Sequence, residues 1–393
     1  MKKVEWRERR VKLGNAIIVG AAFTLIGVYV GMKVGGVSLG FMLNGSGETG
    51  MNWSPLDEVY NKLATSYNGE INREDVINGA KEGLVAALGD KYTVYLNAED
   101  SASFYDDLHG NVGAGIGVEM GLRDGYVRVL RTLPDNPARA AGILAGDIIY
   151  KVDGEEVWRL TSEDVAQKIR GESGTEVSIS VIRGEKEINF NLKREAINNV
   201  SAYVEYNGDA AILTLTRFDK DTGTRAQQIA QEFKERGVKK VILDLRGNGG
   251  GYVSAAQDLL SLWLDGQKCL EQKSKHYGDI VTSTFSGKAI LKDMETVVLV
   301  NGSTASASEI VAGALQDYKK ATIIGETTYG KGVVQNLFDL SGGTTLKVTT
   351  AEWYTPNGRS INGAGIQPDI VVERTYEDIN AMKDPQMDRA KEI

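Results

Sequence analysis

Residues 296–315 have the sequence TVVLVNGSTASASEIVAGAL. An uninterrupted apolar run such as VVLV is typical of a strand that is buried on both faces. A turn of small polar residues follows, and after it a helix. We therefore expect a strand, a tight turn and a helix, with a serine at the helix N-terminus.

The flanking sequence repeats this alternation of strands and helices. The segments between residues 210 and 325 are AILTLT, GTRAQQIAQEFKERG, VILDLR, AAQDLLSLWL, TVVLV, ASEIVAGALQ and ATIIG. Alternation of this kind indicates a layered α/β domain with a largely parallel sheet.

A serine at the helix N-terminus is a candidate nucleophile, because the helix dipole and free N–H groups favour a negatively charged intermediate there. Ser303, Thr304, Ser306 and Ser308 all compete for this role. The alternative is plain N-capping, which any of the four can provide.

A glycine-rich turn follows the strand VILDLR. Gly247, Gly249, Gly250 and Gly251 free the backbone to expose N–H groups at the start of the next helix. Such a nest can hold an anion or a developing oxyanion. The turn lacks the ending of a phosphate-binding P-loop and the spacing of a dinucleotide fold. A purely structural turn is the alternative.

A lysine within TTYGKGVVQNLFDL, residues 327–340, is a candidate base. We expect a strand here, and even spacing along a strand places Lys331 and Gln335 on one face. Desolvation would lower the pKa of the lysine, so that the neutral amine could accept a proton. The two histidines, His109 and His276, lack metal-ligand spacing, and we do not expect a histidine base.

Four ordered motifs carry a resemblance to a known family. They are LDLRGNGGGYV (243–253), VNGSTASASEI (300–310), IGETTYGKGVVQ (324–335) and TTAEWYTPNGRSINGAGIQPD (349–369). The set resembles the carboxyl-terminal processing peptidases, the S41 group of serine proteases. The resemblance implies a crotonase-like α/β core over residues 196–375 and a serine endopeptidase that works through an acyl-enzyme.

The resemblance also implies roles for individual residues. Ser306 would be the nucleophile, Lys331 the general base and Gln335 its supporting residue. The oxyanion would be bound by the backbone N–H of Ala307 and by one of Gly250 and Gly251, and the choice of glycine stays open. No metal and no cofactor are implied.

A mostly β module is expected over residues 111–195. Its β-like runs are YVRVL, DIIYKV, VSISVI and INFNL, with helices near residues 137–141 and 162–169. The module resembles the PDZ domain that these peptidases contain. In GAGIGVEM, Gly115, Ile116, Gly117 and Val118 would form the loop that binds a terminal carboxylate. The implied partners are proteins or peptides with free C-termini.

Two further regions flank these domains. Residues 51–110 are expected to be an N-terminal helical region, with a helical pattern from Pro55 to Leu96, and residues 376–393 a C-terminal tail. Two departures from the family pattern occur, Lys91 in place of a common proline and Val253 in place of a usual leucine. Neither touches an expected catalytic position.

The first fifty residues differ from the rest. Residues 1–12 carry six Lys/Arg against two Glu, and Ala16 to Met32 is a 17-residue run without charge. We interpret residues 1–50 as a cytoplasmic basic tail, a transmembrane anchor and a tether, which places the catalytic part on the extracytoplasmic side. A cleavable signal peptide is the alternative.

Composition excludes some classes of function. The net charge of −8 and the lack of a basic patch after the first dozen residues argue against a nucleic-acid partner. The single cysteine, Cys269, cannot form an intrachain disulfide. Two other classes remain open, a PDZ-type scaffold that no longer cleaves and an acyl-CoA enzyme of the crotonase type. Whether the chain forms a homo-oligomer is left open too.

Overall fold

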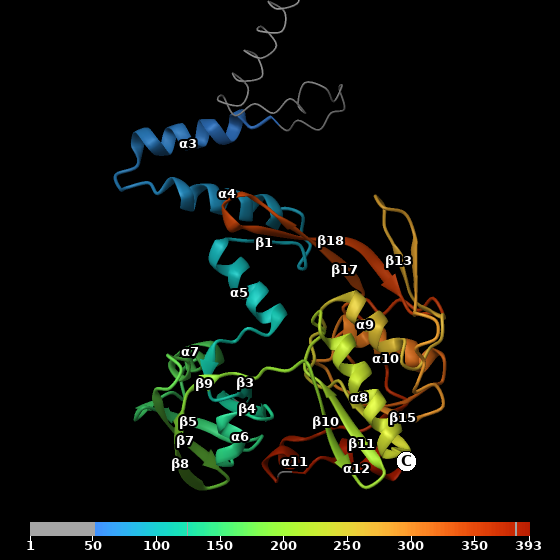
Figure 1. Cartoon of the computed structure of the whole chain (residues 1–393). Coiled ribbons are helices and arrows are strands. Elements are labelled where there is room, and N and C mark those ends of the chain that lie inside the picture. The colour runs from blue at the N-terminus through green and yellow to red at the C-terminus, as the bar shows by residue number, and fades with distance from the viewer. Residues whose placement is uncertain (1–51, 124, 382) are drawn as a thin grey trace, which may run out of the picture. The chain divides into compact units, whose positions relative to one another are not determined.

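The computed structural model describes residues 52–123, 125–381 and 383–393, and it divides into two compact units at residues 76 and 77 (Figure 1). In the first unit, helix α3 (Ser54–Ser66) begins with Pro55 in its first turn, where the missing N–H costs no hydrogen bond. None of the α3 residues is buried, and Leu56, Val59 and Leu63 are exposed. The expected N-terminal helices are therefore present.

The membrane segment expected at residues 16–32 lies outside the described residues. Across the ranges that the structure does describe, every helix is too short or too polar to cross a membrane.

The helical pattern ends earlier than the sequence indicated. Helix α4 spans Arg73–Ala86, but the residues expected to close the helical stretch form strand β1 (Val94–Leu96). This strand pairs antiparallel with β18 (Thr345–Tyr354). The short run TVYL is rich in β-branched and aromatic residues, which fit a pleated surface better than a helix. Helix α5 (Ala98–His109) follows, and the Asn97 side chain caps its N-terminus.

The PDZ region folds into a sheet with the strand order β3-β4-β5-β7-β8. Its strands are β3 (Val118–Arg123), β4 (Tyr126–Thr132), β5 (Ile148–Val152), β6 (Glu155–Glu156), β7 (Glu176–Arg183) and β8 (Lys186–Lys193). Helices α6 (Pro137–Ala141) and α7 (Ser162–Ile169) lie where the sequence predicted them. Strands β2 (Ala114–Gly115) and β9 (Glu195–Ala196) pair where the chain enters and leaves the region.

The α/β core is built on a six-stranded sheet. Its order is β10 (Ala202–Asn207), β11 (Ala210–Leu215), β12 (Lys240–Asp244), β15 (Glu295–Val300), β16 (Thr322–Gly325) and β19 (Ile370–Val371). All neighbours are parallel except the pair of β10 and β11. The predicted α/β class and largely parallel sheet are confirmed, whereas the likeness to a crotonase core remains a prediction.

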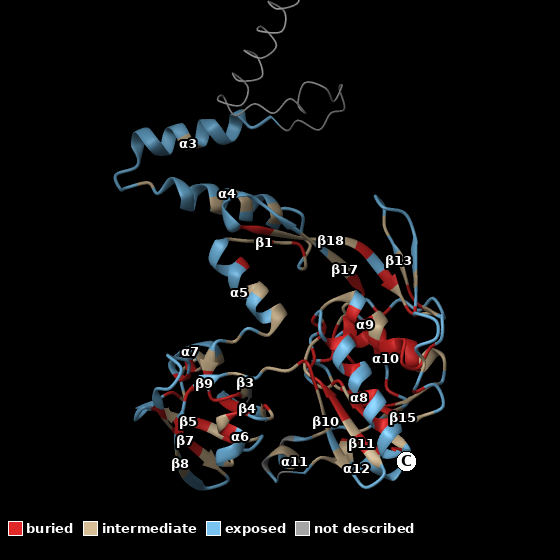
Figure 2. Ribbon diagram, in the orientation of Figure 1, coloured by how far each residue is buried: buried red, intermediate tan, exposed pale blue. Residues whose placement is uncertain are grey.

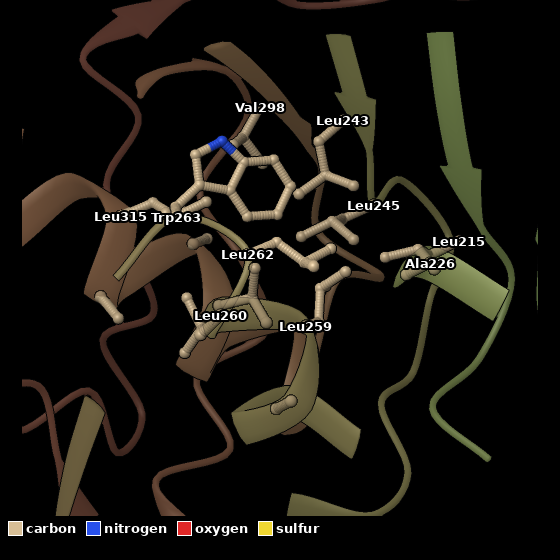
Figure 3. Close-up of a cluster of buried hydrophobic side chains, with 14 of the residues drawn as sticks. Leu215, Ala226, Leu243, Leu245, Leu259, Leu260, Leu262, Trp263, Val298 and Leu315 are labelled. Carbon is tan, nitrogen blue, oxygen red and sulfur yellow. The ribbon is translucent and has the colours of Figure 1, made fainter. Parts of the chain in front are cut away.

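Helices cover both faces of this sheet. On one face pack α8 (Thr222–Arg236), α9 (Val253–Leu260) and α10 (Ala307–Asp317), and the buried residues of α10 are conspicuous in Figure 2. Trp263 lies in this layer among leucines of the sheet, of α9, of α10 and of the segment after α9, and its indole N–H donates to the Thr296 hydroxyl at 2.8 Å (Figure 3). Alternate residues of the same strands face the other side, where Met387 and Ala390 pack.

The residues expected as a tail include two short helices, α11 (Tyr376–Asn380) and α12 (Pro385–Glu392). Helix α12 supplies the apolar cover of the second face. Arg246, which follows strand β12, donates to the Asp384 carboxylate at 2.8 Å and to the Asp244 carboxylate at 2.7 Å. These partly buried ion pairs fix the end of the chain beside the glycine-rich turn.

A second, antiparallel sheet completes the core. Its members are β1, β18, β13 (Lys268–Lys273), β14 (Ile280–Ser283) and β17 (Val333–Asp339), and the short 3-10 helix η1 (Ser341–Gly343) joins β17 to β18. The register between β17 and β18 shifts at Val334/Gln335. This hairpin forms one wall of the cavity described below.

Candidate active site

One cavity of about 630 Å³ gathers the residues that the sequence singled out. Ser306, Lys331 and Gln335 line it together with Gly250 and Gly251, although they come from three separate loops and a strand. The alpha carbon of Gly250 lies against Ser306 and the Ala307 amide, since a β-carbon there would stand 2.8 Å from the serine Cβ and 2.9 Å from the amide nitrogen. The expected nucleophile and oxyanion donors are therefore neighbours, and the expected base lines the same cavity.

Ser306 occupies a strained turn at the start of α10. Its backbone has φ 55° and ψ −117°, in a region that residues other than glycine rarely adopt, at a cost of about 1 to 3 kcal/mol. Strain of this kind is common where a strand-to-helix turn exposes a nucleophile. The serine is thus presented at the helix N-terminus and at the cavity wall.

The three competing hydroxyls lie elsewhere. The hydroxyl of buried Thr304 donates to the Leu245 carbonyl at 2.9 Å, and that of buried Ser308 donates to the Asn248 carbonyl at 3.0 Å. Ser303 is exposed and does not line the cavity. Among the four candidates, Ser306 alone faces the cavity.

A buried carboxylate that the sequence analysis did not select holds this turn in place. Glu309 is fully buried, and its two oxygens accept from the backbone N–H groups of Ser306 (2.8 Å), Gly330 (2.7 Å) and Lys331 (2.9 Å) and from the Thr328 hydroxyl (2.5 Å). A buried charge is tolerated when it is satisfied in this way. Glu309 therefore ties the Ser306 turn directly to the loop that carries Lys331.

Lys331 lies in a loop before β17, and the expectation that it belongs to the strand is wrong. Strand β17 begins at Val333, two residues after Lys331, and Gly332 packs so closely on Asn362 that a β-carbon would stand 2.6 Å from the Asn362 nitrogen. The Trp353 indole N–H donates to the Lys331 carbonyl at 2.9 Å. The lysine reaches the cavity through this loop rather than through strand periodicity.

The electrostatic surroundings of Lys331 suit a base. Burial is the main cause that lowers the pKa of its amine, and the positive charge of Lys347 lowers it further, while the Glu309 carboxylate opposes both. The amine lies 5.6 Å from the ring centroid of Tyr92. The predicted desolvation of Lys331 is thus present, and Lys347 adds a neighbouring cation that the local sequence does not indicate.

Gln335 lines the cavity, but its side-chain amide donates to the carbonyl of Tyr92. The register shift at Val334/Gln335 turns the strand at this point. Tyr92 therefore links the segment before β1 to both the lysine and the glutamine, through its ring and its carbonyl respectively.

The N–H groups near the glycine-rich turn are of two kinds, those with a hydrogen-bond acceptor in the protein and those without one among the described residues. The Gly250 N–H donates to the Asn248 side-chain oxygen at 2.9 Å, whereas the N–H groups of Gly251 and Ala307 have no acceptor within the part of the chain that the structure describes. The buried Asn248 side-chain amide also donates to the backbone carbonyl of Leu215. The backbone carbonyl of Asn248 accepts from the Ala305 N–H. Asn248 thus joins the glycine turn to the serine turn.

A second cavity, of about 600 Å³, runs along the PDZ region. Its lining includes the expected loop Gly115, Ile116, Gly117 and Val118, with Ala166 and Ile169 of α7 opposite. Gly117 has φ 77°, and a β-carbon there would stand 2.2 Å from the Asn136 Cβ. The groove between a strand edge and a helix has the form that strand-adding peptides require.

Cys269 does not compete as a nucleophile. It is buried, and burial raises the pKa of its thiol to about 11. The imidazole of His109 lies 3.4 Å from the Tyr252 hydroxyl and does not line the cavity that holds Ser306.

Comparison with known proteins agrees with this geometry. Residues 209–372 match peptidase family S41, residues 114–193 match the PDZ domain, and residues 21–100 match the N-terminal domain of the activating protease CtpB. A serine peptidase core joined to a PDZ domain is therefore the class to which this fold and site belong.

The relatives are more specific. A probable CtpA-like serine protease of Staphylococcus aureus strain MRSA252 is 32% identical over 380 residues, which are 96% of this chain and 75% of the relative. The solved photosystem II D1 C-terminal processing protease is 29% identical, with a TM-score of 0.55 over 84% of this chain and 90% of its own. A putative S41 protease of Bacteroides fragilis, 17% identical over 86% of this chain and 93% of its own, shares the fold with a TM-score of 0.56. The chain belongs to peptidase family S41, among its C-terminal processing serine proteases.

Proposed function

We propose that this peptidase is an endopeptidase that cleaves protein substrates with a Ser-Lys pair, Ser306 and Lys331, through an acyl-enzyme. The observation that carries the proposal is the convergence of the strained Ser306 turn and the half-buried Lys331 on one cavity, with Glu309 bonded to the backbone of both. The lowered pKa of the Lys331 amine supports its role as base.

The reaction follows from these positions. Neutral Lys331 takes the proton of Ser306 as the hydroxyl oxygen attacks the peptide carbonyl. The resulting oxyanion is stabilised by the N–H groups of Ala307 and Gly251, the two without an internal acceptor among the described residues. The Lys331 ammonium then donates its proton to the leaving amine, and a water molecule, activated by the same amine, releases the acyl group from Ser306. Gln335 supports this arrangement through Tyr92.

Ser306→Ala tests the assignment of the nucleophile. We expect it to abolish cleavage of an unfolded protein substrate while the protein keeps its thermal stability, since only one hydroxyl is lost and the alanine still occupies the turn. Fragments of the substrate are measured by gel electrophoresis and mass spectrometry. Ser303→Ala is the matched control and should remain active, and the reverse result would refute the assignment.

We further propose that substrates are recognised near their C-termini by the PDZ groove. The loop at residues 115–118 and the opposite face of α7 support this. Main-chain hydrogen bonds would give affinity, and the buried Ile116 region would select an apolar terminal side chain.

We also propose that residues 16–32 anchor the protein in a membrane with the catalytic part on the extracytoplasmic side. The support is the uncharged run and the basic residues before it. Deletion of residues 1–50 should give an active enzyme in the soluble fraction after centrifugation. Recovery of that variant in the membrane fraction would contradict the proposal, and mass spectrometry of the native N-terminus separates an anchor from a cleaved signal peptide.

A further inference from the structure

A second lysine lines the catalytic cavity and is not used by the proposed mechanism. Lys347 lies in β18, opposite Leu337 of β17 and Val94 of β1. Directly opposed residues of antiparallel strands share one face of a sheet. The lysine stem is therefore flanked by apolar side chains, and its ammonium contributes to the same cavity as Ser306 and Lys331.

Among the described residues, this ammonium has an aromatic neighbour but no anionic partner. It lies 5.2 Å from the ring centroid of Phe104, within the range of a cation–π contact. Lys347 forms no ion pair with a carboxylate of the described residues. The one acidic residue in the cavity lining, Asp107, has a carboxyl pKa raised by burial, and the charged groups that act on it are Arg170, Glu163 and Asp106.

A half-buried cation without a counter-ion is costly, because the charged form loses hydration without gaining a partner. Burial accordingly lowers the pKa of the Lys347 amine. A carboxylate that entered the cavity would supply the missing partner. The Lys347 charge is close enough to Lys331 to lower the pKa of its amine. A carboxylate bound to Lys347 would therefore lie near the reacting bond.

We propose that Lys347 forms a carboxylate-binding subsite in the wall of the catalytic cavity and selects substrates that carry a carboxylate near the scissile bond. The proposal deepens the peptidase function and rests on it. The carboxylate can come from an Asp or Glu side chain or from the free C-terminus of a short leaving fragment, and both sources present the same group to the ammonium.

The test uses the full-length protein in detergent micelles and pairs of internally quenched peptides that it cleaves. In one arm, Glu is compared with its neutral isostere Gln at each of the four positions on either side of the cleaved bond. In the other arm, short peptides with a free C-terminus are compared with their amides. We expect kcat/KM to be higher for the acidic member by about tenfold or more at one position, as for a hydrogen bond between charged groups.

Variants assign this preference to Lys347. Lys347→Met should bring the Glu/Gln ratio, or the acid/amide ratio, close to one, Lys347→Arg should keep it, and Lys347→Glu should invert it. Lys239→Met is the matched control, because the Lys239 side chain is exposed and outside the cavity, and it should leave the ratios unchanged. The arm in which the preference depends on Lys347 identifies the source of the carboxylate.

Three outcomes would overturn the proposal. Equal rates for every peptide pair with the wild-type protein would do so without any variant. An unchanged Glu/Gln or acid/amide ratio in Lys347→Met would overturn it too. So would an equal loss of rate for acidic and neutral peptides together with a shifted pH profile, because that result would mean that Lys347 acts by adjusting the pKa of Lys331. The affinities of the same peptides for Ser306→Ala measure binding at the Lys347 subsite in the absence of cleavage. A failure of the nucleophile assignment can therefore be distinguished from a failure of the subsite proposal.

Discussion

The catalytic cavity and the PDZ groove share three lining residues, Asp107, Arg217 and Gly249, but otherwise draw on different parts of the chain. The groove loop at residues 115–118 offers main chain, and Ala166 and Ile169 offer apolar surface opposite. The cavity depends instead on individual polar side chains, above all Glu309 and Asn248, which are buried and hydrogen-bonded on several sides. We therefore expect catalysis to fail when a few atoms change, and recognition to weaken gradually when backbone shape changes.

After the complete loss expected for Ser306→Ala, the largest effect in the cavity is expected from Lys331→Arg. A guanidinium does not lose its proton in proteins, so it cannot serve as the base, and kcat/KM should fall by about 10²- to 10⁴-fold. The wild-type rate should rise with pH through one ionisation, because the neutral amine is the active form and its pKa lies below the usual value. Measurement of kcat/KM against pH for both proteins checks this. Substantial activity of the arginine variant with an unchanged profile would assign the base elsewhere.

A second, smaller effect should follow from Glu309→Gln. The amide keeps the shape but presents an NH₂ group to one pair of donors. Each buried donor that is left without an acceptor costs about 1 to 3 kcal/mol of folding stability. The carboxylate raises the pKa of Lys331, so its removal should move the pH profile of the remaining activity to lower pH. Thermal unfolding and the pH dependence of kcat/KM measure the two effects.

The control for this change is Glu352→Gln, at an exposed carboxylate that accepts from the Tyr354 hydroxyl. It should leave both stability and pH profile close to those of the wild type. A Glu309→Gln protein of normal stability whose profile moved to higher pH would contradict the electrostatic role assigned to Glu309.

The smallest effect is expected in the groove, from Gly117→Ala. The positive φ and the closeness of Asn136 should deform the loop at a cost of about 1 to 3 kcal/mol. Discrimination between a free and an amidated substrate C-terminus should fall several-fold, while short peptides are still hydrolysed. Gly154→Ala shares the positive φ, 82°, but has open space around it, and should keep the discrimination. Loss of all hydrolysis in Gly117→Ala would show that the groove and the cavity are not separable.

Local sequence patterns correctly predicted the helices and strands that are determined by residues close together in the sequence. Both PDZ helices begin at caps or prolines that are visible in the sequence, and the buried strands of the core are continuous apolar runs. The prediction that Lys331 lies in a strand was wrong because β17 begins only at Val333, and strand periodicity does not report at which residue the pairing starts.

The supporting residues of the site were missed for a similar reason. Glu309 stands three residues after Ser306, and that spacing alone indicates a capping box. Its other donors, Thr328 and Gly330, come from a loop about twenty residues away. Tyr92 is separated from Gln335 by 243 residues. The choice between Gly250 and Gly251 likewise depended on where the Asn248 side chain points.

The backbone at Ser306 also restricts how this enzyme can evolve. With φ at 55°, the position excludes β-branched side chains far more strongly than it excludes serine or cysteine. Threonine carries the same hydroxyl but adds a methyl group at the β-carbon, and a branched β-carbon is disfavoured at positive φ. Descendants of this protein can therefore exchange oxygen for sulfur at the proposed nucleophile by a single substitution, whereas a threonine enzyme would first need a different backbone conformation at this turn.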